Sequence, residues 1–97
     1  MFYARLINHN NTRLLNICDS NLLGKTIIKE KHSIKISESY YGEKSIKKAE
    51  AEHLLKKCDN INMVGKDIIS LSVSLGIGSE KGVKKIGGIP FLIVFKM

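Results

Sequence analysis

Two apolar-rich segments near the start of the chain, separated by polar residues, predict a β-hairpin. Residues 2–8 and 13–18 are both rich in apolar side chains of the kinds that strands accommodate well. Between them lie His9, Asn10 and Asn11, residue types that are typical of turns. We therefore expect the two segments to pair as antiparallel strands.

The next region predicts one helical turn followed by a longer strand. Asp19 and Ser20 are helix-capping types and Gly24 is a natural stop, so residues 21–23 should form a single turn. Residues 27–37 are predicted to be a strand, with a break near Lys31 as the alternative. If the strand is continuous, one face carries lysines and the other partly enters the core. The first face consists of Lys29, Lys31, Ser33 and Lys35, and the second includes Ile28, His32, Ile34 and Ile36.

Two helices are predicted in the second half of the chain. The first is expected to begin after Ser45, a capping residue, and to run to about residue 58. The second, residues 65–76, has only a narrow polar face and should be the more buried of the two. Lysines in the first turn of the first helix oppose the helix dipole, which indicates a ligand rather than local stability. These lysines are Lys44, Lys47 and Lys48.

The remaining segments complete an α+β pattern. Residues 60–64 are expected to be a short link or strand, and Ser79 is expected to cap a last short helical turn through residue 85. Gly87 and Gly88 then turn the chain into a final strand, residues 89–96. This order indicates a single α+β domain, residues 1–97, with a mixed or antiparallel sheet and two main helices packed on one face.

The charge balance favours a negatively charged partner. Sixteen Lys and Arg side chains stand against nine Asp and Glu side chains, which gives a formal net charge of +7 at pH 7. On a chain of 97 residues this charge favours RNA, DNA or an anionic surface. The alternative is that abundant Lys and Ile reflect stability at high temperature or an AT-rich genome.

No catalytic motif is recognised in the sequence. Gly24, Lys25 and Thr26 resemble the end of a phosphate-binding loop, but the glycine that such a loop needs five positions earlier is replaced by Asp19. The histidines have no partner at metal-ligand spacing, so we expect no metal site. These histidines are His9, His32 and His53.

The two cysteines, Cys18 and Cys58, are too few and too unpatterned for the disulfide framework of a small secreted protein. We expect a cytoplasmic protein with no small-molecule cofactor. Residues 1–8 are too polar for a signal peptide, and the longest apolar run, residues 89–95, is too short to span a membrane.

Two adjacent tyrosines, Tyr40 and Tyr41, are predicted to lie in a loop. They could stack on bases, since Lys35 and Lys44 flank them. The alternative is that one ring closes the edge of the core while the other packs on the first helix. Lys84 and Lys85 add a second basic position.

Four short motifs, in order and at suitable spacing, resemble the archaeal domain-of-unknown-function family 424 over nearly the whole chain. The resemblance implies a small protein with a role around RNA or the ribosome, without supplying a mechanism. One departure is Phe91, where the family often has a histidine after the proline, and this favours binding over catalysis. The motifs are Asp19 with Leu22, Leu23, Gly24 and Lys25; Ser37, Glu38, Ser39, Tyr40, Tyr41 and Gly42; Asn62, Met63, Val64 and Gly65; and Ile86, Gly87, Gly88, Ile89 and Pro90.

These observations lead to three hypotheses. The first is a ribosome-associated protein that binds rRNA or another structured RNA, with ribosomal proteins as further partners. The second is a small RNA-processing enzyme or accessory with a pocket around Asp19, Lys25 and Tyr40. The third is a protein–protein adaptor in a translation complex, which would use the apolar surface near residues 89–95. The RNA-binding residues of the first hypothesis are Lys25, Lys29, Lys31, Lys35, Tyr40, Tyr41, Lys44, Lys47 and Lys48.

Overall fold

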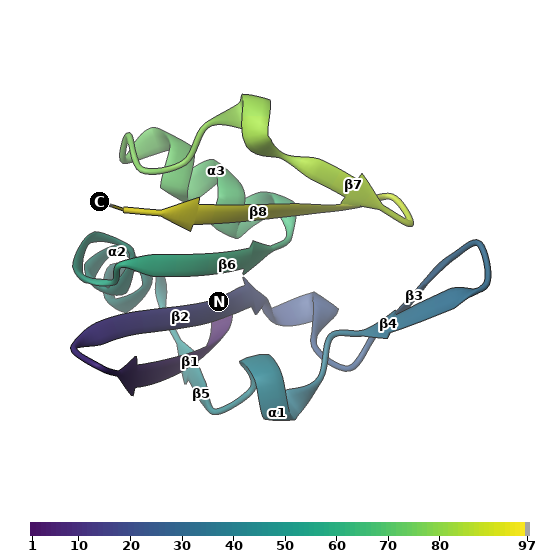
Figure 1. Ribbon diagram of the computed structural model, residues 1–97, viewed down its shortest axis with the longest axis horizontal. Coiled ribbons are helices and arrows are strands. Elements are labelled where there is room, and N and C mark those ends of the chain that lie inside the picture. The colour runs from purple at the N-terminus through teal and green to yellow at the C-terminus, as the bar shows by residue number, and fades with distance from the viewer. Residues whose placement is uncertain (97) are drawn as a thin grey trace.

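The computed structural model describes residues 1–96 and contains a mixed six-stranded sheet (Figure 1). Its strands are β1 (Phe2–His9), β2 (Thr12–Asp19), β5 (Lys44–Ile46), β6 (Asn60–Val64), β7 (Lys84–Ile86) and β8 (Ile89–Phe95). Their order across the sheet is β5-β1-β2-β6-β8-β7, and the β2–β6 pair is parallel while the other pairs are antiparallel. A separate hairpin consists of β3 (Thr26–Lys29) and β4 (His32–Lys35).

The helices are α1 (Glu38–Tyr41), α2 (Lys48–Lys57) and α3 (Lys66–Ser74). Short 3-10 turns at Ser20–Leu22 and Glu80–Gly82 confirm two of the predicted helical turns, although the second ends before residue 85. The predicted β1–β2 hairpin is also confirmed. Its turn residues Asn10 and Asn11 both have positive φ, which asparagine tolerates better than most residues.

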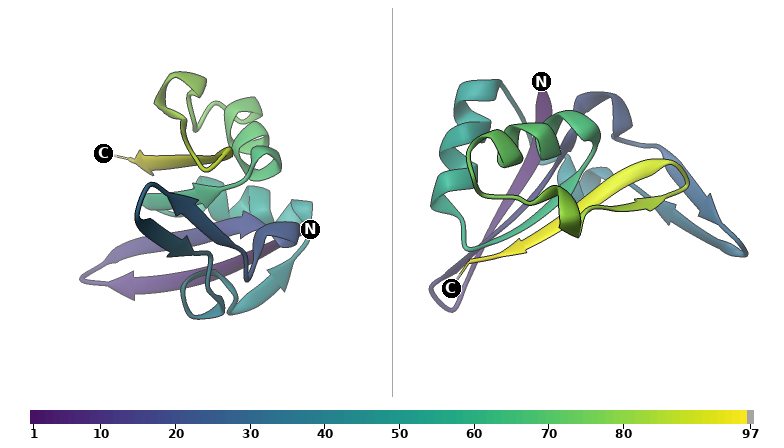
Figure 2. Two further views of the ribbon diagram at one scale, coloured as in Figure 1. Left: turned by 90° about the vertical axis from the view of Figure 1, so that its right-hand side faces the viewer. Right: turned by 90° about the horizontal axis from the view of Figure 1, so that it is seen from above.

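The main core lies between one face of the sheet and helices α2 and α3, which gather on the same side of the strands (Figure 2, right). Alternate residues of the central strands supply the sheet side, including the fully buried Leu15, Ile17 and Ile61. Helix α3 buries four residues and α2 buries two, so α3 is the more buried helix as predicted. The expected α+β class, with a mixed sheet and two main helices on one face, is confirmed.

A second, smaller core lies on the other face and fixes the base of the β3–β4 hairpin. Cys18 and Val64 from the sheet pack with Leu22, Ile27 and Ile36. The rest of the hairpin is exposed and extends beyond the sheet, to the right in Figure 1.

The hairpin corrects the prediction of a continuous strand over residues 27–37. The chain reverses at Glu30 and Lys31, the alternative break, and Glu30 has a φ of 57°. Because Lys29 pairs with His32 and Thr26 pairs with Lys35, the register places Lys29 and Lys35 on opposite faces. The predicted lysine face is therefore wrong. The prediction for the isoleucines is wrong at two positions, since Ile28 is 71% and Ile34 41% exposed.

The start of the first predicted helix is also wrong. Residues 44–46 form β5, because their backbone pairs with β1 and because Ile46 is needed in the core, where it is 2% exposed. Helix α2 begins only at Lys48, with Lys47 as its N-cap. Lys44 therefore does not belong to a helical turn, and its Nζ lies 2.9 Å from Oε2 of Glu50. The tyrosine segment, predicted as a loop, is the short helix α1.

The two layers are joined by a carboxylate at the end of β2. Asp19 is 4% exposed, and its two oxygens accept hydrogen bonds from the backbone N–H groups of Asp67 (3.0 Å) and Ile68 (2.8 Å) in the first turn of α3. It thus caps α3 from a neighbouring strand. Burial raises the pKa of Asp19, while these two hydrogen bonds oppose that shift.

Gly65, the residue before α3, allows this approach. It has a φ of 117°, and a Cβ at this position would lie 2.4 Å from Cγ of Asp19. Its own N–H donates to the carbonyl of Pro90 at 2.9 Å, which ties β8 into the same place. We call Asp19, Gly65, the two capped N–H groups of α3 and Pro90 the Asp19 junction.

Replacing Asp19 with alanine should lower the free energy of unfolding by about 1–3 kcal/mol, because two helix N–H groups lose their acceptors. Urea denaturation measures the change. The matched control is Asp67→Ala, which removes an exposed carboxylate from the same turn. Equal stability of Asp19→Ala and the wild type would contradict this role.

Candidate nucleic-acid interface

The sheet face opposite the main core carries three rows of side chains that run across the strands. Strand pairing aligns the members of each row, so their side chains share this face. The inner row consists of Tyr3, Cys18, Val64 and Phe91; the amide row of Arg5, Asn16, Asn62 and Ile93; and the outer row of Ile7, Leu14, Asn60 and Phe95. The second core covers the inner row, whereas helix α1 borders the amide row and Ile93 and Phe95 of the other two rows are exposed.

The amide row places two asparagines side by side at the centre of the sheet. Asn16 and Asn62 are direct partners in the parallel β2–β6 pair, and Nδ2 of Asn62 donates to Oδ1 of Asn16 at 3.0 Å. Asn16 is 6% exposed, whereas Asn62 is exposed. The centre of this face is therefore polar, while its neighbours Ile93 and Phe95 are apolar and 58% and 70% exposed.

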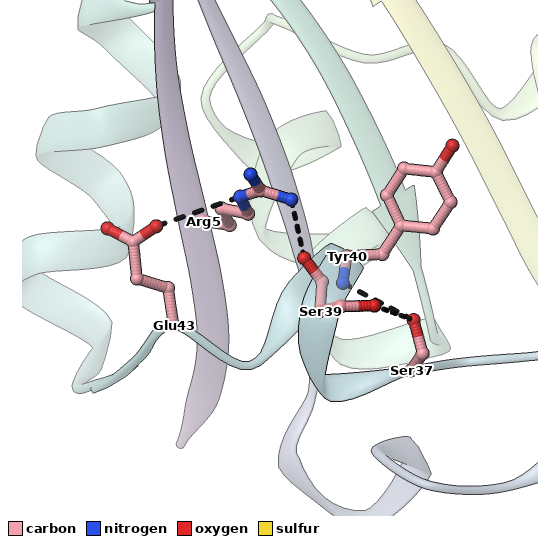
Figure 3. Close-up of polar contacts among 5 residues, drawn as sticks. All are labelled: Arg5, Ser37, Ser39, Tyr40 and Glu43. Atoms are coloured by element: carbon pink, nitrogen blue, oxygen red, sulfur yellow. Dashed lines mark hydrogen bonds and ion pairs between the residues drawn. The ribbon is translucent and has the colours of Figure 1, made fainter.

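Tyr40 reaches the edge of this face from α1, whose position is fixed by polar contacts (Figure 3). The side chain of Ser37 caps the helix by accepting from the N–H of Tyr40 at 3.3 Å. Arg5 donates to the carbonyl of Ser39 at 2.5 Å and lies 3.7 Å from the Glu43 carboxylate. Arg5 thus links α1 to the amide row.

The two tyrosines have different environments. Tyr41 is half-buried and packs against the second core, and burial raises its pKa. Tyr40 is 61% exposed, and the two ring centroids lie 6.1 Å apart at 55°. The alternative of a tyrosine that closes the core edge thus describes Tyr41, while Tyr40 remains available for a contact.

A hollow of about 420 Å³ lies over the amide and outer rows. A second hollow of about 300 Å³ adjoins it, and the two share Asn62 and Ile93. We call the first the open-face hollow; its lining is Ile7, Leu14, Asn16, Tyr40, Asn60, Ile61, Asn62, Ile93 and Phe95. The lining of the second is Tyr41, Asn62, Met63, Val64, Lys84, Ile86, Phe91 and Ile93.

The structure divides the predicted lysines into two groups. Lys29, Lys31 and Lys35 are exposed on the projecting hairpin, and Lys25 is exposed at its base. The only acidic residue between positions 25 and 35 is Glu30. The hairpin base packs on the inner row, so this basic arm borders the open face.

The second group, Lys44, Lys47 and Lys48, lies away from the hairpin. Helix α2 and the hairpin lie at opposite ends of the molecule in Figure 1 and in the right panel of Figure 2. Lys44 pairs with Glu50, Lys47 precedes α2, and Lys48 lines a separate hollow with Asp67 and Ser70. These lysines therefore do not form one patch with the hairpin.

The pocket predicted around Asp19, Lys25 and Tyr40 receives no support. Asp19 is occupied as the cap of α3 and lines a hollow of about 180 Å³ that includes neither of the other two residues. Tyr40 lines the open-face hollow instead.

The two cysteines are poor candidates for nucleophiles. Cys18 and Cys58 are both 0% exposed, and burial raises the pKa of the Cys18 thiol to about 12. No group of three metal-ligating side chains occurs within residues 1–96. In the same part of the chain, no helix is long and apolar enough to cross a membrane.

Local sequence patterns do not predict the amide row. Asn16 lies between the apolar residues Leu15 and Ile17, and Asn62 lies between Ile61 and Met63, four residues before α3. Such interruptions are a visible signal, but only the β2–β6 register shows that the two amides meet. Ile93 and Phe95, which were assigned to a protein-binding surface, lie on this same face.

Comparison with known proteins agrees with the motifs. A family model described as "Protein of unknown function (DUF424)" matches residues 7–97. The chain belongs to this family. A crystal structure of an uncharacterized conserved protein from Methanopyrus kandleri is similar, with a TM-score of 0.77, 24% identity, and coverage of 99% of this chain and 93% of that one. This likeness shows the fold alone. A search of curated proteins finds no match.

Packing explains several residues of the four sequence motifs. Asp19, Gly65 and Pro90 come from three motifs and meet in the Asp19 junction. Gly87 closely approaches the hairpin, since a Cβ there would lie 2.4 Å from Cγ2 of Ile27. Tyr40 is the exposed large hydrophobic residue of the motifs.

Proposed function

We propose that the protein binds RNA through the open sheet face. The observation that carries the proposal is that two exposed aromatic rings, Tyr40 and Phe95, line the same hollow as the amides of Asn16 and Asn62. Sheet faces with exposed aromatic side chains bind single-stranded RNA because bases stack on the rings. Tyr40 stacks on one base and Phe95 on a neighbouring one.

The basic hairpin supports this proposal by supplying contacts to phosphates. Its lysines extend from the end of the sheet where the inner row is covered, so a strand that crosses the open face can continue along the arm. Lysine–phosphate contacts hold the RNA without reading its sequence. The net charge of +7 adds long-range attraction.

A protein partner is the competing explanation for exposed Ile93 and Phe95, as in the adaptor hypothesis. The amides and the neighbouring lysines favour RNA, since a wholly apolar partner would bury these polar groups without acceptors or donors. The family resemblance directs the search to ribosomal RNA. Sedimentation with ribosomal subunits at low salt, and release at high salt, is the expected behaviour in cell extracts.

Tyr40→Ala and Phe95→Ala should each weaken binding to single-stranded RNA by about 1–3 kcal/mol, because each removes one stacking platform. Fluorescence anisotropy with a labelled oligonucleotide measures the change. His53→Ala is the matched control, since it removes an exposed ring on α2. Equal losses of RNA affinity in all three variants, or no loss in Tyr40→Ala and Phe95→Ala, would count against the open face as the RNA-binding surface.

Combined replacement of Lys29, Lys31 and Lys35 with alanine should reduce the slope of log Kobs against log salt by about 2, if each lysine neutralises one phosphate of a single strand. The control replaces three exposed lysines elsewhere, Lys56, Lys57 and Lys81. The hairpin has no phosphate role if both triple variants keep the wild-type slope.

A further inference from the structure

We infer that Asn16 and Asn62 form the floor of a subsite for one unpaired nucleobase. This inference rests on the proposed function and adds to it the selection of a particular base. General attraction and stacking need only lysines and rings, so they leave the two amides unexplained.

The Asn16–Asn62 pair has unused hydrogen-bonding capacity. The bond from Asn62 to Asn16 uses one N–H of Asn62 and the oxygen of Asn16. Within residues 1–96, no side chain or backbone group is hydrogen-bonded to Nδ2 of Asn16 or to Oδ1 of Asn62. The pair therefore keeps both a donor and an acceptor for a ligand.

The position of the Asn16–Asn62 pair limits which ligands can reach it. Both residues line the open-face hollow, and Asn16 is only 6% exposed, so a ligand that reaches it must enter the hollow. The rim is formed by Tyr40, Ile93 and Phe95, which are apolar surfaces suited to the face of a ring. A flat group with apolar faces and a polar edge fits this arrangement.

A nucleobase has the chemistry that this hollow requires. A nucleobase has such faces and edges, and asparagine amides bind base edges through paired donor and acceptor bonds. In a duplex the faces are stacked and one edge is paired, so the hollow selects an unpaired base. The charge of the protein and the adjacent lysines favour a base carried on a phosphate backbone over a free aromatic ligand.

The test measures affinities for labelled eight-nucleotide homopolymers of adenosine, cytidine and uridine, and for a duplex. The wild type should prefer one homopolymer by about tenfold, in the range that a good amide–base contact provides. In Asn62→Ala, an exposed position, the preference should fall to about twofold or less, with weaker binding to the preferred sequence alone. Asn8→Ala, an exposed asparagine outside the hollow, is the control and should keep the preference.

Several results would overturn the subsite. Equal binding of all homopolymers, or a preference unchanged in Asn62→Ala, would remove the base selection while the proposed function stands. Binding to the duplex as tight as to the preferred strand would do the same. No binding to any RNA at low salt would overturn the subsite and the proposed function together.

Discussion

The Asp19 carboxylate is the interaction on which this small structure depends. Asp19 ends β2, caps α3 and lies against Gly65, whose N–H donates a hydrogen bond to the carbonyl of Pro90. Helix α3 supplies much of the main core, so the cap couples the helical layer to three neighbouring strands. The positive end of the helix and the two N–H donors compensate in part for the water that this buried carboxyl group loses, although burial still raises its pKa.

The two faces of the sheet are covered to different extents. One face is closed by α2 and α3, and the inner row of the other face is closed by the second core. What stays open is the amide row beside a mainly apolar outer row, with Arg5 hydrogen-bonded to α1, which carries Tyr40. A sheet needs only one covered face for stability, so the second is free to serve binding.

Much of the fold could be predicted from local patterns, and the failures have physical causes. The β1–β2 hairpin, α3 and the final strand follow from periodicity and turn residues. The reversal between β3 and β4 was only the alternative to a continuous strand, because the positive φ of Glu30 is uncommon for its residue type. Residues 44–46 have capping and helical residue types, yet pairing with β1 and burial of Ile46 override these preferences. The amide row depends on the parallel register of two distant strands, which no local pattern encodes.

We propose that the open sheet face, and not the helical face, contacts RNA. Photocrosslinking of the protein to a single-stranded RNA containing 4-thiouridine, followed by mass spectrometry of the peptides, tests it most directly. We expect crosslinks at Tyr40 and Phe95, the exposed rings that line the open-face hollow. Crosslinks confined to α2 and α3, with none on the rows of the open face, would contradict it.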